Sequence, residues 1–162
     1  MEHPLRRRKQ KLSDAEVETI LSNCTSGVLG MIDPDGFPYT VPLSFAFEKN
    51  RFYFHSATHG HKISALTADD RASFTVIASD EIVPEKFTTK FRSVIAQGHA
   101  HLVEDAAEKR HALELLVAKY SPTFEAAGAE TIAKEWDCTQ VIRLDVENIC
   151  GKEGMELVKL RK

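Results

Sequence analysis

The residues best suited to chemistry lie between Phe52 and Lys62, where a strand pattern ends in a small polar turn. Ser56 supplies a hydroxyl group, Gly60 supplies a turn with loosely packed backbone N–H groups, and Lys62 supplies an ammonium group. The residues from Lys62 to Ala68 predict a short helix, whose N-terminus favours negative charge. This combination suits a bound phosphate, although turns of similar composition also occur without a ligand.

The clearest alternation of apolar and polar residues in the chain lies just before this turn. Residues 39–47 alternate with the period of a strand, and Lys49-Asn50 predicts a hairpin turn into a second strand at 51–56. Pro42 cannot donate a hydrogen bond to a neighbouring strand, so we expect an edge or a bulge at this position. A flat ligand could lie along such an interrupted edge, next to the polar turn.

Six strand patterns, joined mostly by hairpins, account for much of the chain. They lie at 28–32, 39–47, 51–56, 71–78, 91–103 and 142–147. Gly98 predicts a bulge in the fifth strand. Helices are predicted at 13–23, where Ser13 and Glu16 form a capping box, and at 62–68, 106–120 and about 124–136. The sequence therefore predicts a mainly β protein, an antiparallel barrel with helical additions, rather than a doubly wound parallel sheet.

Length and composition restrict the class of protein. The 162 residues fit a single domain, 1–162, with inserted helices and a basic N-terminal arm at Arg6–Lys11 that we expect to be solvated. A net charge of −3 argues against nucleic-acid binding, and no apolar run reaches membrane-spanning length. Cys24, Cys138 and Cys150 have neither zinc nor C-x-x-C spacing, so we expect reduced thiols in a cytoplasmic protein and no metal site.

Three histidines, His55, His59 and His61, lie close together in the sequence. The break between Thr58 and Gly60 removes any predictable convergence of these side chains on a metal ion. His55 is a candidate catalytic proton donor, and the alternative is a packing residue or one that lines the substrate space. A haem ligand is a further alternative.

Three segments match a known family in order and spacing. They are Gly36–Leu43, then Phe52–Ala57 with Gly60 and Lys62, then Thr88–Ile95 with Gly98. The pattern resembles the FMN-binding split-barrel family related to pyridoxamine 5′-phosphate oxidase. It most resembles the branch of nitroimidazole-resistance (Nim-type) nitroreductases, and the likeness extends from about Leu12 to about Lys152.

The resemblance implies a homodimer of six-stranded antiparallel split β-barrels, with FMN at the subunit interface. The cofactor-binding residues that it implies are Ser56, Ala57 and Lys62 at the phosphate, Thr40, Val41 and Pro42 along the isoalloxazine ring, Arg92 and Ser93 from the long strand, and His55 facing the flavin or the substrate.

The function that follows from the resemblance is that of an FMN-dependent oxidoreductase. Such an enzyme takes reducing equivalents from a nicotinamide donor or another reductant and passes them to a small acceptor, for example a nitro-aromatic compound. True pyridoxamine phosphate oxidases close over flavin and substrate with a C-terminal segment that carries a tryptophan and an arginine. This chain ends in residues 151–162 instead, a segment without tryptophan, so vitamin B6 chemistry is not expected. The alternative is a non-catalytic split-barrel protein that binds flavin or haem.

Overall fold

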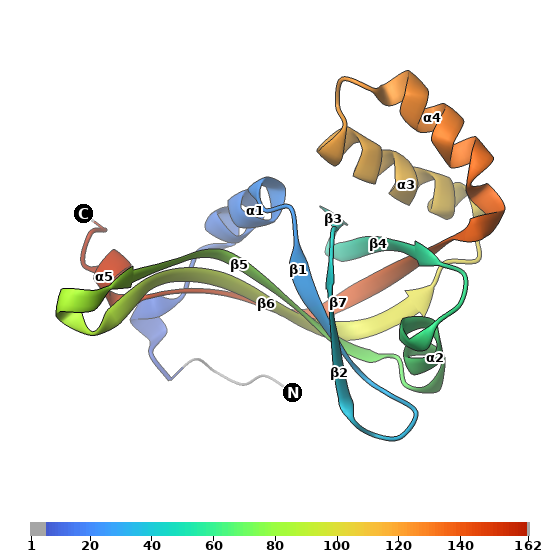
Figure 1. Ribbon diagram of the computed structural model, residues 1–162. Coiled ribbons are helices and arrows are strands. Elements are labelled where there is room, and N and C mark those ends of the chain that lie inside the picture. The colour runs from blue at the N-terminus through green and yellow to red at the C-terminus, as the bar shows by residue number, and fades with distance from the viewer. Residues whose placement is uncertain (1–5, 162) are drawn as a thin grey trace.

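The computed structural model describes residues 6–161 (Figure 1). Within these residues, seven strands form one antiparallel sheet in the order β2-β1-β5-β6-β7-β4-β3. The strands are β1 (Gly27–Ile32), β2 (Pro38–Leu43), β3 (Ala46–Glu48), β4 (Arg51–Ala57), β5 (Arg71–Val83), β6 (Thr88–Leu102) and β7 (Thr139–Glu153). The helices are α1 (Asp14–Asn23), α2 (His61–Ala68), α3 (Ala106–Tyr120), α4 (Glu125–Lys134) and α5 (Met155–Val158). The chain is thus mainly β with helical additions, as the sequence predicts.

Three predictions that depend on local sequence are confirmed. The Ser13 hydroxyl accepts a hydrogen bond from the Glu16 N–H while the Glu16 carboxylate accepts one from the Ser13 N–H, which is the capping box that opens α1. Lys49 and Asn50 adopt φ angles of 50° and 64° in the turn between β3 and β4. Gly98 lies at a register shift between β6 and β7, where a Cβ atom would lie 1.9 Å from the Asp145 carbonyl oxygen.

The sequence predicts six strands, whereas the structure has seven, because the segment 39–47 is divided. Its first part is β2, at one edge of the sheet, and its second part is β3, at the other edge. Ser44 and Phe45 alone separate the two strands. The two edges are therefore at most about 11 Å apart at this junction, three Cα steps of about 3.8 Å. The sheet coils so that its edges meet at the junction, although no hydrogen-bonded ladder joins β2 to β3 among the described residues.

The central strands are longer than the sequence patterns suggest. β5 continues to Val83 and β6 begins at Thr88, so the predicted polar loop around Pro84 is a tight turn at the tip of a hairpin. β7 pairs with β6 along this hairpin as far as Glu153. We call the part of β5, β6 and β7 that extends away from α2 the arm; α5 lies near its tip (Figure 1).

Two apolar clusters stabilise the fold, one on each face of β4. Inside the coiled sheet, Phe52 and Phe54 pack against Phe74 with ring centroids 5.0 and 4.8 Å apart. On the other face of β4, Tyr53 is buried against a second cluster that includes residues of α3 and α4. The sequence predicts a half-buried strand at 51–56, but Tyr53 is buried as well because α3 and α4 cover the outer face (Figure 1).

The junction between β2 and β3 is held by the last residue of α3. The Tyr120 hydroxyl oxygen accepts a hydrogen bond from the Phe45 N–H at 2.8 Å, and its proton faces the carbonyl oxygens of Phe45 and Thr25, at 2.8 and 2.7 Å. Phe45 is fully buried, so its main chain needs such partners once the strand pairing stops. Lys119 reinforces the junction, since its Nζ lies 3.7 Å from the centroid of the Phe45 ring.

Replacement of Tyr120 by Phe removes one hydroxyl group and leaves the buried Phe45 N–H without its partner. We expect the free energy of unfolding to fall by about 1–3 kcal/mol, the cost of an unsatisfied buried donor, measured by urea denaturation. Tyr39→Phe is the matched control, since the described residues offer its hydroxyl no hydrogen bond. Equal stability of the two variants would show that the Tyr120 hydroxyl does not support the junction.

Candidate functional site

The turn between β4 and α2 is open and its helix end is uncapped. Gly60, the N-cap of α2, has a φ of 124° and offers no side-chain hydrogen bond to the first turn. A Cβ atom at this position would meet nothing within 4 Å. Ser56 lies half-buried at the end of β4, four residues earlier. The first amides of α2 are therefore available to an anion.

Lys62 lies in the first turn of α2 and is half-buried. Burial lowers the pKa of its ammonium group below the ordinary value for a lysine, because water is removed from the charge. Among residues 6–161, no carboxylate forms an ion pair with Lys62 to compensate for this desolvation. A half-buried cation beside open amides fits the charge and the acceptor oxygens of a phosphate.

The strand β2 lies against the same end of α2. The Tyr39 ring stacks on the His61 imidazole, with centroids 4.2 Å apart and planes inclined by 12°, and His61 Nε2 lies 3.7 Å from Asp33 Oδ2. This contact places Thr40, the residue after Tyr39, close to the α2 turn. The structure thus brings together two groups that the sequence analysis singled out, the β2 residues and the Lys62 turn.

The three predicted ring-binding residues of β2 do not share a face. Thr40 and Pro42 are exposed on the outer face of the sheet, whereas Val41 is half-buried and packs against the main core. Val41 can therefore offer a ligand its backbone only. β2 is an edge strand, as Pro42 predicted, and its second edge has no strand partner among the described residues. A flat ring can approach this edge closely.

Ser93 lies on the same outer face, but at a distance from β2. Pro42 pairs with Val28, Val28 with Thr75, and Thr75 with Ile95, which are neighbours across four strands. With strands about 4.8 Å apart, the path along the sheet from Pro42 to Ile95 is about 14 Å long. Ser93 lies two residues further along β6. A single chain therefore does not bring Ser93 to the β2 edge.

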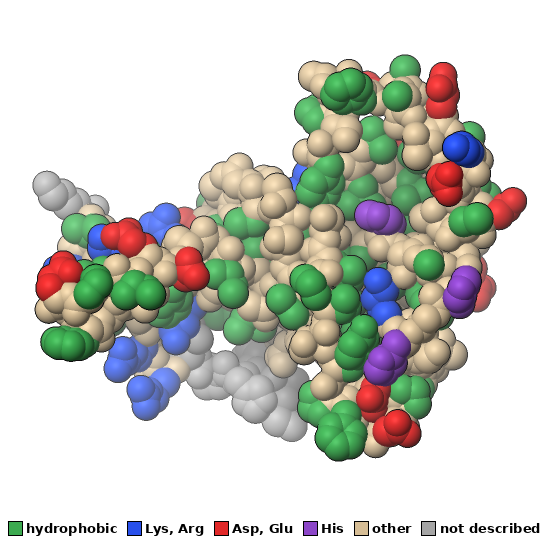
Figure 2. All heavy atoms as spheres, viewed as in Figure 1, with side chains coloured by type: hydrophobic (Ala, Val, Ile, Leu, Met, Phe, Trp, Pro, Cys, Tyr) green, Lys and Arg blue, Asp and Glu red, His purple; other side chains and the backbone are tan. Residues whose placement is uncertain are grey.

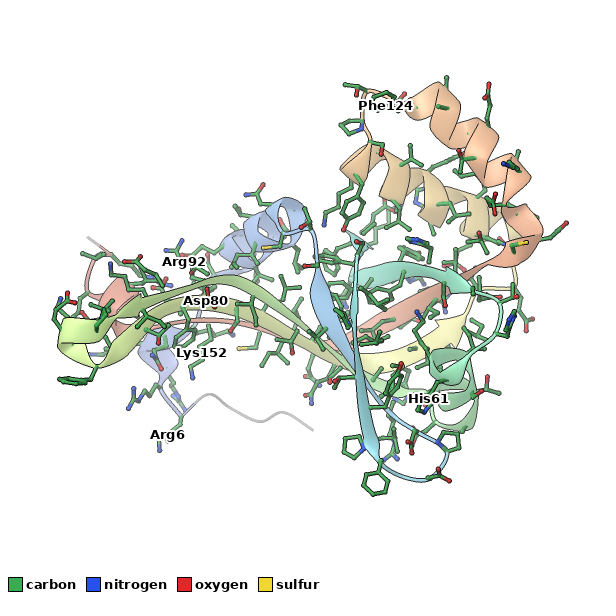
Figure 3. The ribbon with its side chains drawn as sticks, in the orientation of Figure 1. Arg6, His61, Asp80, Arg92, Phe124 and Lys152 are labelled. Carbon is green, nitrogen blue, oxygen red and sulfur yellow. The ribbon has the colours of Figure 1, made fainter. Side chains whose placement is uncertain are left out.

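Arg92 is directed to the face opposite to that of Ser93, since successive residues of a strand alternate. Its Nε donates a hydrogen bond to Glu153 Oε2 at 3.0 Å, and Glu153 is fully buried. Arg161 lies on the other side of the same carboxylate, with its Nε 2.5 Å from Glu153 Oε1. Figure 3 shows Arg92 on the arm and His61 at the other end of the molecule. Arg92 is thus occupied in an ion pair far from the Lys62 turn.

His55 lies on the face of β4 opposite to that of Ser56. It lines a groove of about 760 Å³ between β4 and the helices α3 and α4. The groove is lined mainly by apolar side chains, including Leu113, Leu116 and Ile132. Ala57 shares this outward face of β4 and is exposed. His55 and Lys62 therefore serve two different spaces.

Neither a membrane helix nor a metal cluster is found in the described part of the chain. Within residues 6–161, no helix is both long enough and apolar enough to cross a membrane. In the same range, no group of three or more His, Cys, Asp or Glu side chains is arranged to hold a metal ion.

Sequence reasoning gave too little weight to two residues. Gln10 was expected in a solvated arm, yet only 3% of its surface is exposed. Lys152 belongs to β7 and shares the outer face with Ser93, its partner in the β6–β7 register. An extension of the last strand pattern from 142–147 to residue 153 would have placed Lys152 on this face.

Comparison with known proteins adds a family to this geometry. The chain matches the family described as pyridoxamine 5′-phosphate oxidase over residues 13–153. No curated protein matches the chain at a significant level.

Three solved structures illustrate the similarity. A candidate 5-nitroimidazole antibiotic resistance protein from Bacteroides thetaiotaomicron is 25% identical, with a TM-score of 0.71 over 88% of this chain and 86% of that one. A flavocytochrome from Azotobacter vinelandii is 26% identical, with a TM-score of 0.77 over 94% and 72% of the two chains. An FAD-binding protein from Mesorhizobium loti is 25% identical, with a TM-score of 0.62 over 90% and 97%. Since the matched family covers residues 13–153 of 162, the chain belongs to the pyridoxamine 5′-phosphate oxidase family.

Proposed function

We propose that the protein is a flavin-dependent oxidoreductase that holds FMN with its phosphate at the β4–α2 turn. It takes reducing equivalents from a nicotinamide donor and passes them to a small acceptor such as a nitro-aromatic compound. One observation carries the proposal: Lys62 is a half-buried cation without a carboxylate partner among the described residues, beside the uncapped N-terminus of α2. Such a site is stabilised by an anion.

The rest of the turn and the β2 edge support the same ligand. The Ser56 hydroxyl can donate to a phosphate oxygen, and the backbone from Thr40 to Pro42 offers a free edge to a flat ring. A bound flavin supplies the electron or hydride transfer itself. The protein's residues have to bind the phosphate, orient the ring and limit the access of water. The similarity to a candidate nitroimidazole resistance protein supports the nitro-aromatic acceptor.

We further propose that the flavin site is completed by a second copy of the chain. Val28, Ile77 and Ile95 are exposed on the outer face that also carries Thr40, Pro42 and Ser93. Ile82 and Phe87, near the tip of the arm, are 72% and 98% exposed. Figure 2 shows apolar side chains at the tip of the arm and near the centre of the visible face. A homodimer would cover these side chains and could bring Ser93 of one copy to the β2 edge of the other.

A second candidate function is haem binding in the groove beside His55. A histidine in an apolar space is the arrangement that ligates haem iron in many proteins. The groove of about 760 Å³ provides that space, and the similar protein from Azotobacter vinelandii is a flavocytochrome. His55 would then be an iron ligand, whereas the sequence analysis gives it as a candidate proton donor, with packing or lining of the substrate space as the alternative.

Replacement of Lys62 by Gln removes the cation and keeps a polar side chain of similar length. We expect FMN binding to weaken by about 1.5–3 kcal/mol, the range for a hydrogen bond to a charged group, measured by fluorescence titration of the reconstituted protein. Lys49→Gln, at the exposed β3–β4 turn, removes the same charge and should bind FMN as the unchanged protein does. If wild-type protein binds no FMN, or if both variants bind it equally well, the proposed site is wrong.

Proton uptake provides a second test of Lys62. Its pKa is lowered in the free protein, and a bound phosphate should raise it again, so binding should take up a proton at pH values between the two pKa values. The affinity for FMN should accordingly fall as the pH rises through this window. The window begins below 10.5, the ordinary pKa of a lysine, and it lies above the second pKa of the phosphate, about 6. Calorimetric titration in buffers of different ionisation enthalpy measures the uptake. Uptake of the same size in Lys62→Gln would exclude Lys62 as its source.

Haem binding can be tested independently of flavin. Haemin added to the purified protein should produce a Soret band if the groove binds it, and His55→Ala should shift or abolish this band because the iron loses its protein ligand. His59→Ala, in the exposed turn after β4, is the matched control. A Soret band that is the same in His55→Ala would exclude His55 as the ligand.

A further inference from the structure

The basic N-terminal segment, Arg6–Lys11, is attached to the sheet, whereas the sequence analysis expects a solvated tail. Lys11 forms a β-bridge with Lys152 of β7, and the Leu12 N–H donates to the Gly151 carbonyl oxygen at 3.0 Å. The short helical turn at Arg8–Gln10 precedes this contact. The basic residues at the start of the described chain are thereby held beside the outer face of the arm formed by β5, β6 and β7.

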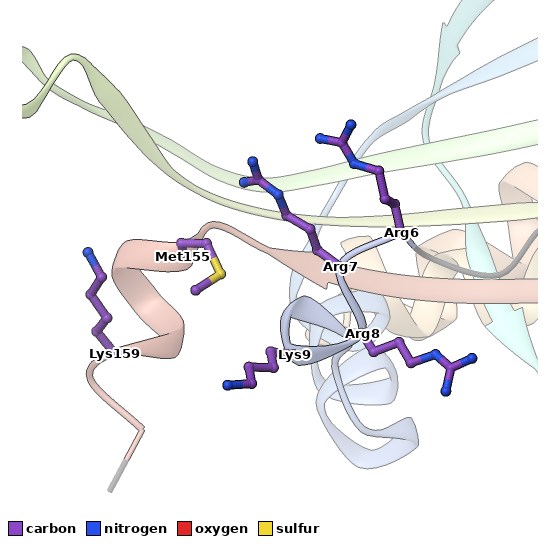
Figure 4. Close-up of a pocket in the computed structure, with 6 residues that line it drawn as sticks. All are labelled: Arg6, Arg7, Arg8, Lys9, Met155 and Lys159. Atoms are coloured by element: carbon purple, nitrogen blue, oxygen red, sulfur yellow. The ribbon is translucent and has the colours of Figure 1, made fainter.

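The attachment forms a narrow cleft, which we call the basic cleft. It has a volume of about 230 Å³ and is lined by Arg6, Arg7, Gln10, Phe91 and Lys152. A wider hollow of about 720 Å³ shares Arg6 and Arg7 with it and is also lined by Arg8, Lys9, Met155 and Lys159. In Figure 4 the side chains of Arg6 and Arg7 point toward the strands, whereas those of Arg8 and Lys9 point away from them.

The charge of the basic cleft is not neutralised by the described chain. Arg6, Arg7 and Lys152 form no ion pair within residues 6–161, whereas Lys159 pairs with Glu156 at 2.8 Å. Asp80 lies opposite Phe91 in the β5–β6 register but does not line the cleft. Two guanidinium groups and an ammonium group around one small space favour a multiply charged anion, and guanidinium groups match phosphate oxygens in pairs.

Gln10 and Phe91 indicate that the ligand is more than a free phosphate. The Gln10 Oε1 atom is buried and has no hydrogen-bond partner, which is costly unless a ligand supplies a donor. Phe91 offers a half-buried ring, and Lys152 Nζ lies 5.5 Å from its centroid. A side-chain amide recognises adenine through the amino group and a ring nitrogen of the base, and an aromatic ring stacks on a base.

We propose that the basic cleft binds an adenine nucleotide, with its phosphates at Arg6, Arg7 and Lys152 and its base at Gln10 and Phe91. The nucleotide could be that of a nicotinamide dinucleotide, or the adenylate half of an FAD whose flavin half is held at Lys62 of a second copy. The second copy is needed because the two phosphates of FAD are directly linked, whereas the Lys62 turn and Lys152 lie at opposite ends of one chain (Figure 3). This choice of source rests on the proposed oxidoreductase function. The binding of an adenine nucleotide itself does not rest on that function. ADP contains the shared chemistry and is the probe for the site.

The test is the affinity of the full-length protein for ADP at low ionic strength, measured by calorimetry. The double variant Arg7→Gln/Lys152→Gln should bind ADP about 10- to 100-fold more weakly than the wild-type protein, because it loses two charged contacts. Lys134→Gln, which removes an exposed charge at the end of α4 and lines neither space, should change the affinity by less than about threefold, the scale of a screened surface charge. Thermal unfolding of each variant verifies that the fold is retained.

A second variant separates base recognition from charge. Phe91→Leu keeps an apolar side chain but removes the ring, so it should weaken ADP binding and leave pyrophosphate binding unchanged. The proposal is overturned if the wild-type protein does not bind ADP, if the double variant binds it as well as Lys134→Gln does, or if pyrophosphate binds as tightly as ADP. Failure of FMN to bind at Lys62 would leave these ADP measurements unaffected, so the two proposals fail separately.

The source of the nucleotide is distinguished by comparing FMN, FAD and NADPH. If the cleft holds the adenylate half of the flavin, FAD should bind more tightly than FMN, and the double variant should abolish this difference. If the cleft holds the nicotinamide dinucleotide, FMN and FAD should bind alike, and the double variant should raise the KM for NADPH. Both results support an adenine nucleotide in the basic cleft.

Discussion

The contact of the Tyr120 hydroxyl with the Phe45 main chain is the constraint on which the arrangement of the site depends. The hydroxyl oxygen accepts from the Phe45 N–H, and its proton is shared between the carbonyl oxygens of Phe45 and Thr25. A strand that continued through Phe45 would keep β2 and β3 in one line. The side-chain partner allows the pairing to stop without leaving buried polar groups unsatisfied, so β2 and β3 take opposite edges of the sheet. The turn after β4 and the edge of β2 then approach each other, and the stack of Tyr39 on His61 fixes their contact.

The distribution of ion pairs separates the cations that support the fold from those that remain for a ligand. Arg92 and Arg161 share the buried carboxylate of Glu153, and removal of either partner of a buried pair is costly. Lys62 has no such partner in the described chain and is partly desolvated. Lys152 is also unpaired there and faces the side of the sheet opposite to that of Arg92. Lys62 and Lys152, two cations without an ion pair in the described chain, are therefore at two separate places.

Features set by a few adjacent residues were predictable from the sequence, and features set by distant residues were not. The capping box at Ser13 and the turn at Lys49-Asn50 need only their own side chains and backbone angles. The interruption at Phe45 was hidden because Phe45 continues the alternation of residues 39–47, while its partner Tyr120 is 75 residues away in the chain. The pairing of Arg92 with Glu153 spans 61 residues. The opposite directions of Arg92 and Ser93 follow from the period of a strand.

The distance between the two groups of cations restricts how any ligand can use them. Within one chain, the path along the sheet from the β2 edge to Ile95 is about 14 Å long, three strand spacings, and Ser93 and Lys152 lie further along the arm. If FMN were held at Lys62 with its ring along the β2 edge, the ring would not reach the arm of the same chain. Contacts from Ser93 to that ring therefore require the arm of a second copy. The exposed apolar residues Val28, Ile77 and Ile95 lie on the outer face between the β2 edge and the arm. If a second copy buried these residues, the same contact would bring the arm of that copy to a ring held at the β2 edge.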